Sequence, residues 1–563
     1  MEYIYKGCIL KLGKNENFMI GKIINGKIWN KRPTETVAGA ALIVSVAGIL
    51  SRLLGLARDR ILASQFGAGN TLDVYYAAFS VPNLVYNLLI VGALSAAFIP
   101  VFTGLIVKKK KRQAWRLASG LLTLQVSAVV IISFFLMMFA PQIMKFVTPG
   151  FSDEKMRAVV FLTRIMFLSP LLLGASAIFG GMLVSFKRFL IYSLAPIAYN
   201  LGIIVGAVLF VKFWGIAGLA WGVVLGASLH LLLQFLAVKS LGFSFQFQHL
   251  RNIVFDKQIR RIIYLMIPRS LAIGVNQINL LVITIFASLL ASGSLAVFNF
   301  ANNLQSVPLG IFGISFALAA FPKLSSLAAK GDMKKFQYVF ARTFKRILFF
   351  VIPASVIIFS LRAEIVRAVL GAGKFDWQDT RATLLVLGIL SVSLFAQSTV
   401  PLLARAFYAL ENTKIPLYVS LFSETVNILT IILLIDRFQV LGLAIAFSLT
   451  ALVNMTLLFV LLNRRFFKNG QNVQIFGSVF KMIISATLTM LAIYFTRHFL
   501  SNFISLKTLA EVLLQLFLSI GIGAVVYLIA CHWLKVEEFY DFKKSILIRV
   551  LGQPKDIVRI SDK

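Results

Sequence analysis

Apolar stretches of about 20 residues recur along almost the whole chain, and they constrain its fold more than any other feature. A helix of that length crosses a hydrocarbon core of about 30 Å. Inside lipid every backbone N–H and C=O must be bonded within the protein, so only helices and closed barrels are allowed. These stretches are continuous apolar runs and lack the alternation of barrel strands. The sequence therefore predicts an all-α polytopic membrane protein.

Fourteen transmembrane helices are predicted, and several are longer than a perpendicular span requires, so we expect tilting. Only 14% of the residues are charged and 59% are hydrophobic, which leaves no segment with the composition of a soluble domain. The predicted spans are 37–65, 73–107, 116–148, 157–186, 189–212, 216–238, 262–291, 295–325, 337–361, 383–410, 415–435, 440–463, 475–496 and 508–534.

The net charge is +35, with 56 Lys and Arg against 21 Asp and Glu. Such a charge could indicate nucleic-acid binding, but the basic residues form short clusters between apolar segments, as the positive-inside rule describes. With the N-terminus inside, these clusters fall in alternate loops, and an even number of spans places both termini in the cytoplasm. We therefore expect a multi-pass plasma-membrane protein that contacts membrane lipids and binds no nucleic acid.

Spans 2 and 8 resemble each other, which suggests an internal repeat. The segments Phe66 to Pro100 and Leu289 to Pro322 share a glycine-containing turn, an inner Ser-Val-Pro and a final Ala-Ala-Phe. A six-helix unit keeps its orientation in both copies, so the two lobes would form a parallel repeat around a central cavity. The predicted organisation is an N-terminal extension (1–35), an N-lobe (36–238), a cytoplasmic linker (239–261), a C-lobe (262–463), spans 13 and 14 (464–534) and a cytoplasmic tail (535–563).

Ionisable residues inside apolar spans are costly and are therefore candidates for a functional site. The first span carries Arg52, Arg58, Asp59 and Arg60. Arg52 and Asp59 are seven residues apart, so they share a helix face that Arg58 flanks. A guanidinium matches phosphate oxygens, and Asp59 could hold an Arg when no ligand is bound. Arg60 could instead extend its charged end to the membrane interface. Asp73 could instead be favoured by the dipole of the helix at whose start it lies.

Arg164, Arg269 and Glu424 are isolated charges in spans 4, 7 and 11. Glu424 and Asn427 share a face of span 11, where they could bind a cation or a proton. They could instead form hydrogen bonds or an ion pair with Arg269. The two cysteines and four dispersed histidines have no metal-binding spacing, and no P-loop or nucleophile–base pair is present. We expect a transporter without a cofactor that is not an enzyme and is coupled to a monovalent cation, a proton or the membrane potential.

Five motifs of the N-terminal half carry a family resemblance. They are Ser51-Arg-Leu-Leu-Gly-Leu-Ala-Arg-Asp59, Phe66-Gly-Ala-Gly69, Asp73, Val81-Pro-Asn83 and the run from Gly92 to Pro100. Together they resemble the MurJ (MviN) family of lipid II flippases, within the multidrug and polysaccharide exporter superfamily. The resemblance implies transport of undecaprenyl-diphosphate-linked disaccharide-pentapeptide across the bacterial plasma membrane. It also implies a role in peptidoglycan synthesis, cell wall biogenesis and cell shape, with the cell-wall synthesis machinery as a candidate partner.

The resemblance also implies roles for individual residues. By matching position, Arg52, Arg58 and Asp59 would lie near the diphosphate or the sugar of the substrate, with Asp73 and Asn83 in support. The two lobes would alternate access to a central cavity, and spans 13 and 14 would line a groove for the lipid tail. Arg269 or Arg164 would replace positive charge that this chain lacks at positions where the family commonly has arginine.

Several positions depart from the family pattern. An Arg pair is common after the Pro-Asn of span 2, where this chain has Tyr86-Asn87, and a Glu is usual where it has Val91. Span 8 usually carries Asp-Arg, which is replaced by Asn302-Asn303, and Ile283 lies near the position of an acidic sodium ligand. Because bases and acids are lost together, we interpret these changes as compensated.

Two other functions remain open from the sequence. One is export of another polyprenyl-diphosphate-linked glycan, or of a small cationic compound, by the same fold. The other is a non-transporting membrane scaffold descended from a flippase. A substitution at Arg52 separates transport of a diphosphate-linked substrate from a scaffold, because only transport needs the guanidinium.

Overall fold

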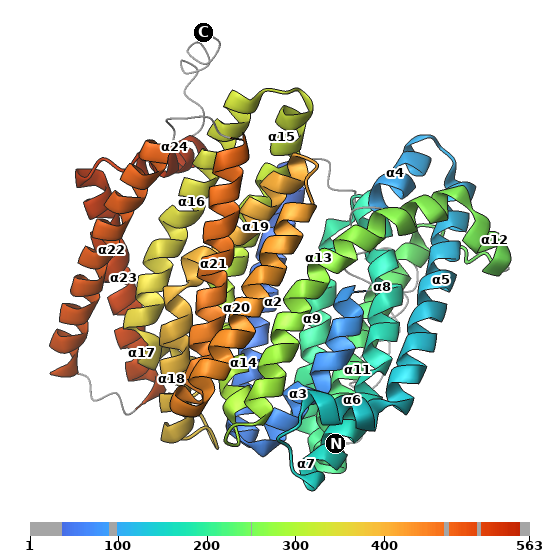
Figure 1. Cartoon of the computed structure of the whole chain (residues 1–563), viewed down its shortest axis with the longest axis horizontal. Coiled ribbons are helices and arrows are strands. Elements are labelled where there is room, and N and C mark those ends of the chain that lie inside the picture. Colours follow the sequence, from blue (N-terminus) through green and yellow to red (C-terminus); the bar gives the residue numbers. More distant parts are fainter. Residues whose placement is uncertain (1–36, 89–97, 249, 467–471, 504–507, 552–563) are drawn as a thin grey trace, which may run out of the picture. The chain divides into compact units, whose positions relative to one another are not determined.

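The computed structural model describes residues 37–88, 98–248, 250–466, 472–503 and 508–551. Helices lie over all fourteen predicted segments, and the described residues contain no strand, which confirms the all-α class (Figure 1). The chain divides into two compact units, the first formed by residues 1–61 and 74–281 and the second by residues 62–73 and 282–563. The predicted domain limits stay a prediction.

The first unit contains most of α2, α3 and α13 and all of the helices between α3 and α13. Their bounds are α2 (Val37–Phe66), α3 (Asn70–Tyr86), α4 (Ile99–Val107), α5 (Lys111–Met138), α6 (Ala140–Val147), α7 (Asp153–Met166), α8 (Leu168–Ser185), α9 (Phe189–Val205), the π-helix η3 (Gly206–Phe210), α10 (Val211–Trp214), α11 (Ala217–Ser240), α12 (Leu250–Phe255) and α13 (Lys257–Ser288).

The second unit contains the remaining helices together with the turn between α2 and α3. Their bounds are α14 (Ser294–Pro308), the π-helix η4 (Leu309–Ile314), α15 (Ser315–Ala329), α16 (Met333–Ser360), α17 (Arg362–Val369), α18 (Trp377–Val392), α19 (Leu394–Ala409), α20 (Lys414–Phe438), α21 (Val440–Phe466), α22 (Asn472–Ser501), α23 (Leu509–Trp533) and α24 (Glu537–Leu551).

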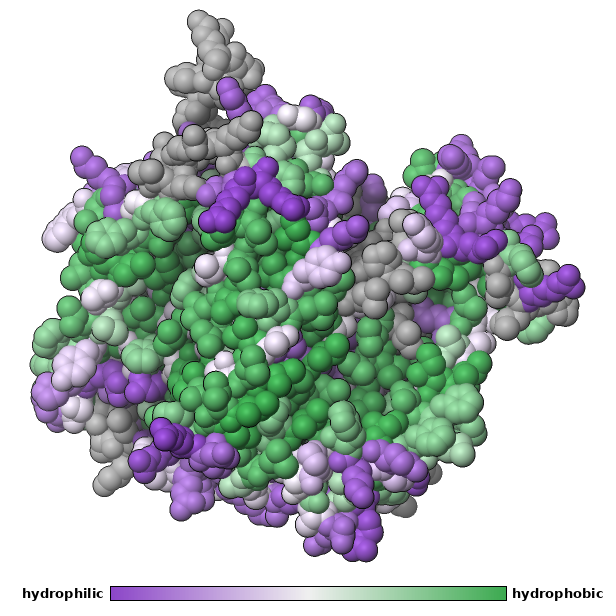
Figure 2. Space-filling view, in the orientation of Figure 1, coloured by the Kyte–Doolittle hydropathy of each residue, from purple (hydrophilic) through white to green (hydrophobic). Residues whose placement is uncertain are grey.

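Ten helical segments of the described residues are long and apolar enough to cross a membrane. The pair α18 and α19, bent by 46°, would be an eleventh. On the face drawn in Figure 2, apolar side chains cover the middle of α20 and α21, and hydrophilic side chains gather near the helix ends. This distribution fits a membrane protein, whereas the count of fourteen spans stays a prediction.

Two glycine series bring α9 and α11 into close contact within the first unit. A Cβ on Gly202 would lie 2.2 Å from the Cα of Gly226, and one on Gly206 would lie 2.3 Å from the Cα of Gly222. Gly202 of α9 and Gly206 at the start of η3, four residues apart, therefore let this segment touch the backbone of α11, which is a common packing mode between membrane helices. This contact fixes α9, which carries a residue of the candidate site.

Helix α24 is attached to α16 by ion pairs. Arg342 and Arg346 of α16 bind the Asp541 carboxylate at 2.8 and 3.1 Å, and the Lys345 ammonium lies 2.7 Å from Glu537 and 3.0 Å from Glu538. Lys345 is only 8% exposed, so its charge is compensated by these two carboxylates. The helix after the last apolar span is thus anchored to the second unit by charge.

We expect Asp541→Asn to loosen α24. Burial raises the pKa of the Asp541 carboxyl, but the hydrogen bonds and charges of Arg342 and Arg346 lower it more, so the pKa lies below its ordinary value. Because this pKa is lowered, the ion pair stabilises the contact at pH values above the ordinary carboxyl pKa. The stabilisation is lost as the pH falls below about 4. Hydrogen exchange of α24 at neutral pH should therefore rise in the variant, and in the unmodified protein only in acid.

The control is Asp436→Asn at the exposed end of α20, which should leave the exchange of α24 unchanged. Equal exchange of α24 in the Asp541 variant and the unmodified protein would show that the carboxylate does not hold this helix.

Candidate functional site

The charged residues of the first span form a buried cluster in the first unit. The Arg58 guanidinium donates to one Asp59 carboxylate oxygen through Nε at 3.0 Å and through Nη2 at 2.7 Å. Its Nη1 donates to the Asn200 side-chain oxygen at 3.1 Å. The Asp59 side chain is 3% exposed and that of Arg58 22%. An arginine is thus held in place by a carboxylate from its own helix and an amide from α9.

Asn200 is a member of this cluster that the sequence analysis missed. Its side-chain nitrogen donates to the Pro196 carbonyl one turn earlier on α9, at 3.0 Å, which orients the amide oxygen toward Arg58. The available signal was an amide in the middle of an apolar span, four residues after a proline. Buried polar side chains in membrane helices pair across helices, so an amide at this position predicts a polar partner on another helix.

Arg52 is half-buried on the same helix, two turns before Asp59. The first span therefore carries two guanidinium groups. That of Arg58 is held by Asp59 and Asn200, and that of Arg52 belongs to a residue nearer the start of α2. An incoming diphosphate could compete with Asp59 for the donors of Arg58, because both present oxygens to the same planar fork. This arrangement gives the first span the chemistry of an anion site.

Asp73 lies in the second unit and is 3% exposed. One carboxylate oxygen accepts the backbone N–H of Gly293 at 2.6 Å, and the other accepts that of Ala296 at 3.0 Å. The two turns that resemble each other in sequence are therefore joined, with the Asp73 carboxylate serving the start of α14. This geometry favours the structural explanation of Asp73, and a role in substrate binding stays a prediction.

The turn between α2 and α3 makes two further contacts in this unit. The Ala68 N–H donates to the Asp379 carboxylate at 2.8 Å, and the Ser64 carbonyl accepts the N–H of Lys374 at 2.8 Å. Gly293 has a positive φ of 91°, and a Cβ on it would lie 1.9 Å from the Ala68 carbonyl oxygen. The close approach of the two turns therefore requires glycine at position 293.

Asp73→Ala is expected to destabilise the protein by about 3 kcal/mol, because two buried backbone N–H groups lose a charged acceptor. The midpoint of thermal unfolding in detergent should fall accordingly. Asp153→Ala, which removes an exposed carboxylate from the first turn of α7, is the matched control and should leave the midpoint nearly unchanged. Equal midpoints for the two variants would contradict the structural role of Asp73.

Glu424 and Asn427 meet on α20 as the sequence predicts. The Asn427 side-chain nitrogen donates to the Glu424 carboxylate at 3.1 Å, and the two residues are 0% and 7% exposed, respectively. The Asn427 amide oxygen is buried and accepts no hydrogen bond within the described part of the chain. A buried carboxylate beside an unused carbonyl oxygen has the ligand chemistry of a cation site.

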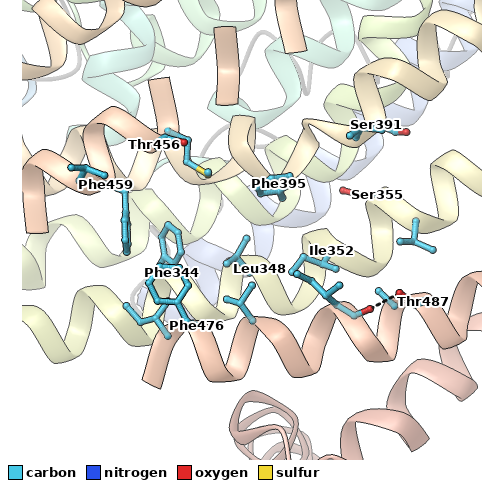
Figure 3. Close-up of a pocket in the computed structure, with 18 of the residues that line it drawn as sticks. Phe344, Leu348, Ile352, Ser355, Ser391, Phe395, Thr456, Phe459, Phe476 and Thr487 are labelled. Atoms are coloured by element: carbon cyan, nitrogen blue, oxygen red, sulfur yellow. Dashed lines mark hydrogen bonds between the residues drawn. The ribbon is translucent and has the colours of Figure 1, made fainter. Parts of the chain in front are cut away.

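An apolar pocket of about 710 Å³ lies in the second unit (Figure 3). Helices α16, α18, α19, α21 and α22 line it, with Phe344, Phe395, Phe459 and Phe476 among the lining side chains and Asn463 and Arg464 as polar members. Span 13, which is α22, lines the pocket, and the lipid-tail groove of spans 13 and 14 stays a prediction. No residue of α23, the predicted span 14, lines it; α23 packs against α22 instead.

The family model described as "Lipid II flippase MurJ" matches residues 62–514, which is most of the chain. The chain belongs to the lipid II flippase MurJ family. The probable lipid II flippase MurJ of Buchnera aphidicola subsp. Acyrthosiphon pisum is 32% identical over 513 residues, which cover 89% of this chain and 98% of that protein. The one of Rhizobium tropici is 30% identical over 433 residues, which cover 75% and 80%.

Solved structures show the same fold. Lipid II flippase MurJ in an inward closed conformation matches with a TM-score of 0.71 at 23% identity, over 91% of this chain and all of that one. An inward-facing multidrug resistance MATE family transporter of the MOP superfamily matches with a TM-score of 0.63 at 15% identity, over 76% of this chain and 98% of that one. The MurJ fold of this chain is therefore a variant of a wider transporter fold.

Two of the neutral residues that depart from the family pattern, Asn87 and Asn302, make side-chain hydrogen bonds. The Asn87 side-chain nitrogen donates to the Asn83 side-chain oxygen at 2.9 Å, and the Gln305 amide donates to Asn302 at 3.0 Å. Gln305 also lies 3.3 Å from Gln397 of α19, which extends the amide cluster. These amides therefore satisfy each other's hydrogen bonds, and compensated change stays a prediction.

The remaining predicted residues are placed as follows. Arg164 is exposed, and its Nε donates to the Met137 carbonyl at 3.2 Å near the break between α5 and α6, so it serves a helix end. Arg269 lies on α13, but its side chain is outside the described residues, as is Val91. Neither arginine therefore has an assigned place near the α2 cluster.

Proposed function

We propose that this protein is a flippase that moves lipid II from the inner to the outer leaflet of the bacterial plasma membrane by alternating access. The observation that carries the proposal is the match to the lipid II flippase MurJ family over residues 62–514. The flippase supplies peptidoglycan synthesis with its precursor and performs transport rather than covalent chemistry. Both termini lie in the cytoplasm in this proposal, because the basic clusters then fall on the inner side.

Recognition of the headgroup is assigned to α2. Arg52 and Arg58 bind the diphosphate, and Asp59 and Asn200 keep the Arg58 guanidinium oriented when no substrate is present. Asp59 releases donors of Arg58 when phosphate oxygens replace its own, so the site exchanges one anion for another. Asn83 and Arg269 stay candidate supporting residues in the first unit.

The apolar pocket between α16 and α22 is assigned to part of the prenyl tail. Most of its lining residues are aliphatic or aromatic, and a volume of about 710 Å³ accommodates a hydrocarbon segment. An isoprenoid chain that stays in an apolar pocket while its headgroup moves avoids exposure to water. The tail therefore needs no polar partner along this pocket.

Coupling to a monovalent cation or a proton is assigned to Glu424 and Asn427. Glu424→Gln should slow flipping by about tenfold or more, because a neutral amide cannot compensate a bound cation or carry a proton. Flipping in proteoliposomes should also lose its dependence on an imposed sodium or proton gradient. The control, Asp436→Asn, removes an exposed carboxylate of the same helix and should retain that dependence. A Glu424 variant with unchanged gradient dependence would contradict this assignment.

Complementation tests the proposed function in cells. A bacterium depleted of its own lipid II flippase lyses for lack of cell wall, and expression of this protein should prevent lysis. Lysis despite normal amounts of the protein in the membrane would exclude lipid II as the substrate. That outcome would favour export of another polyprenyl-diphosphate-linked glycan or of a small cationic compound, or a scaffold role. A partner in the cell-wall synthesis machinery stays a prediction.

A further inference from the structure

A basic groove of about 620 Å³ lies in the first unit where α4 ends and α5 begins. Five of its lining residues are cations and none is acidic. The cations are Lys109, Lys110, Lys111, Arg112 and Arg116. Gln113, Gln246, Phe247 and Gln248 complete the lining. The groove is separate from the α2 cluster and from the apolar pocket, and the proposed transport of lipid II does not account for it.

An aromatic cluster gives the groove a rigid base. Trp115, one turn into α5, is 5% exposed. Its ring lies 5.7 Å from that of Phe102, 5.6 Å from that of Phe186 and 5.4 Å from that of Phe243, measured between centroids. Aromatic pairs at these distances stabilise one arrangement of the elements that carry them. The start of α5 is therefore fixed against α4, α8 and the segment after α11.

Hydrogen bonds fix the opposite wall, which is the extended segment 241–248. The Gln248 amide donates to the Arg116 carbonyl at 2.7 Å, and the Gln246 N–H donates to the Ser119 hydroxyl at 3.0 Å. The Lys111 ammonium donates to the Leu241 carbonyl at 2.9 Å. The groove is thus a built feature of the fold, with its cations on one wall and amides on the other.

The placement of the cations is unfavourable without an anion. The N-terminus of a helix carries a partial positive charge, and acidic residues are favoured in its first turn. Here α5 begins with Lys111 and Arg112, its N-cap is Lys110 with no side-chain cap, and its first turn holds no acid. Five like charges around one concave surface repel one another as well. A bound phosphate would relieve both effects at once.

We propose that this groove binds the phosphate-bearing headgroup of an anionic membrane phospholipid. Its location at the shared end of two apolar helices corresponds to the membrane boundary, where phospholipid headgroups lie. Phe245 and Phe247 are 49% and 79% exposed beside the cations, as expected of side chains that contact the acyl chains of a bound lipid. Inorganic phosphate, which has no apolar part, would gain nothing from these exposed rings.

Binding to the purified protein in a neutral detergent tests the proposal, with dioctanoyl phosphatidylglycerol as the probe. The groove variant combines Lys109→Gln, Lys110→Gln and Arg112→Gln, which are exposed and spare the bonds of Lys111 and Arg116. The control combines Lys323→Gln, Lys330→Gln and Lys334→Gln, three exposed cations of α15, the following turn and α16, and loses the same charge. We expect about tenfold or more weaker binding in the groove variant and less than about twofold in the control.

Two further measurements decide between headgroup and soluble anion. Dioctanoyl phosphatidylcholine should bind much more weakly than phosphatidylglycerol, and inorganic phosphate at matched ionic strength should not displace the lipid. The thermal unfolding midpoint of the groove variant without lipid should be no lower than that of the control, which excludes misfolding as the cause. Equal losses of affinity in the two triple variants would overturn the proposal. Displacement by inorganic phosphate at the concentration of the lipid would overturn it in favour of a soluble phosphate ligand.

Discussion

Alanine in place of Arg52 is expected to abolish the ability of the protein to support growth of a bacterium depleted of its own lipid II flippase. Arg52 is half-buried in α2, on the face that also carries Asp59. Loss of a charge-assisted bond to a diphosphate costs about 1.5–3 kcal/mol, which slows transport by about tenfold to a hundredfold. Growth should therefore fail although the protein reaches the membrane.

The control for this experiment is Arg60→Ala. Arg60 is also half-buried on the same helix, so the control removes the same kind of charged side chain. We expect that variant to support growth, because the interface explains its position. If both variants supported growth, Arg52 would not be needed to bind the diphosphate, and if both failed at normal abundance, the effect would not be specific to Arg52.

Leucine in place of Arg58 is expected to destabilise the protein by about 3 kcal/mol. The substitution removes the guanidinium that binds Asp59 and Asn200, and it leaves a carboxylate that is 2% exposed without this partner. Removal of one member of a buried ion pair is costly because the other charge stays desolvated. The midpoint of thermal unfolding in detergent should fall clearly below that of Arg157→Leu, an exposed arginine of α7 that serves as the control.

A second substitution distinguishes loss of the pair from poor packing of leucine. Combining Arg58→Leu with Asp59→Asn also removes the buried carboxylate charge that has lost its arginine, so the double variant should be more stable than Arg58→Leu alone. An equal or lower midpoint in the double variant would show that the Arg58–Asp59 pair is not the source of the stability.

The positions of the helices along the sequence could be predicted from the lengths of the apolar stretches, but the breaks within them could not. The segment 383–410 was predicted as one span, yet α18 ends at Val392 and α19 begins at Leu394 with a bend of 46°. The Ser393 hydroxyl oxygen lies 3.1 Å from the Leu390 carbonyl oxygen and 3.0 Å from the Ser448 hydroxyl of α21, within hydrogen-bond distance of both. Serine can compete for helix carbonyls, but whether it bends the helix depends on a partner that only the tertiary structure supplies.

The candidate site could be predicted in part. Heptad spacing identified Arg52 and Asp59 as neighbours on one face, and the three-residue spacing of Glu424 and Asn427 gave a contact that the structure confirms at 3.1 Å. The roles of Asn200 and Gly293 could not be predicted, because their partners lie more than a hundred residues away in the sequence. The glycines of α9 and α11 had a readable spacing, but only the structure shows which helices they join.

Lipid II exposed on the outer leaflet is the most direct measure of the central claim. In bacteria depleted of their own flippase, the fraction of lipid II that an externally added cleaving enzyme reaches should fall. Expression of this protein should restore that fraction to the level of undepleted cells, and expression of the Arg52→Ala variant should not. If lipid II stayed inaccessible while the unmodified protein was present in the membrane, the protein would not be a lipid II flippase.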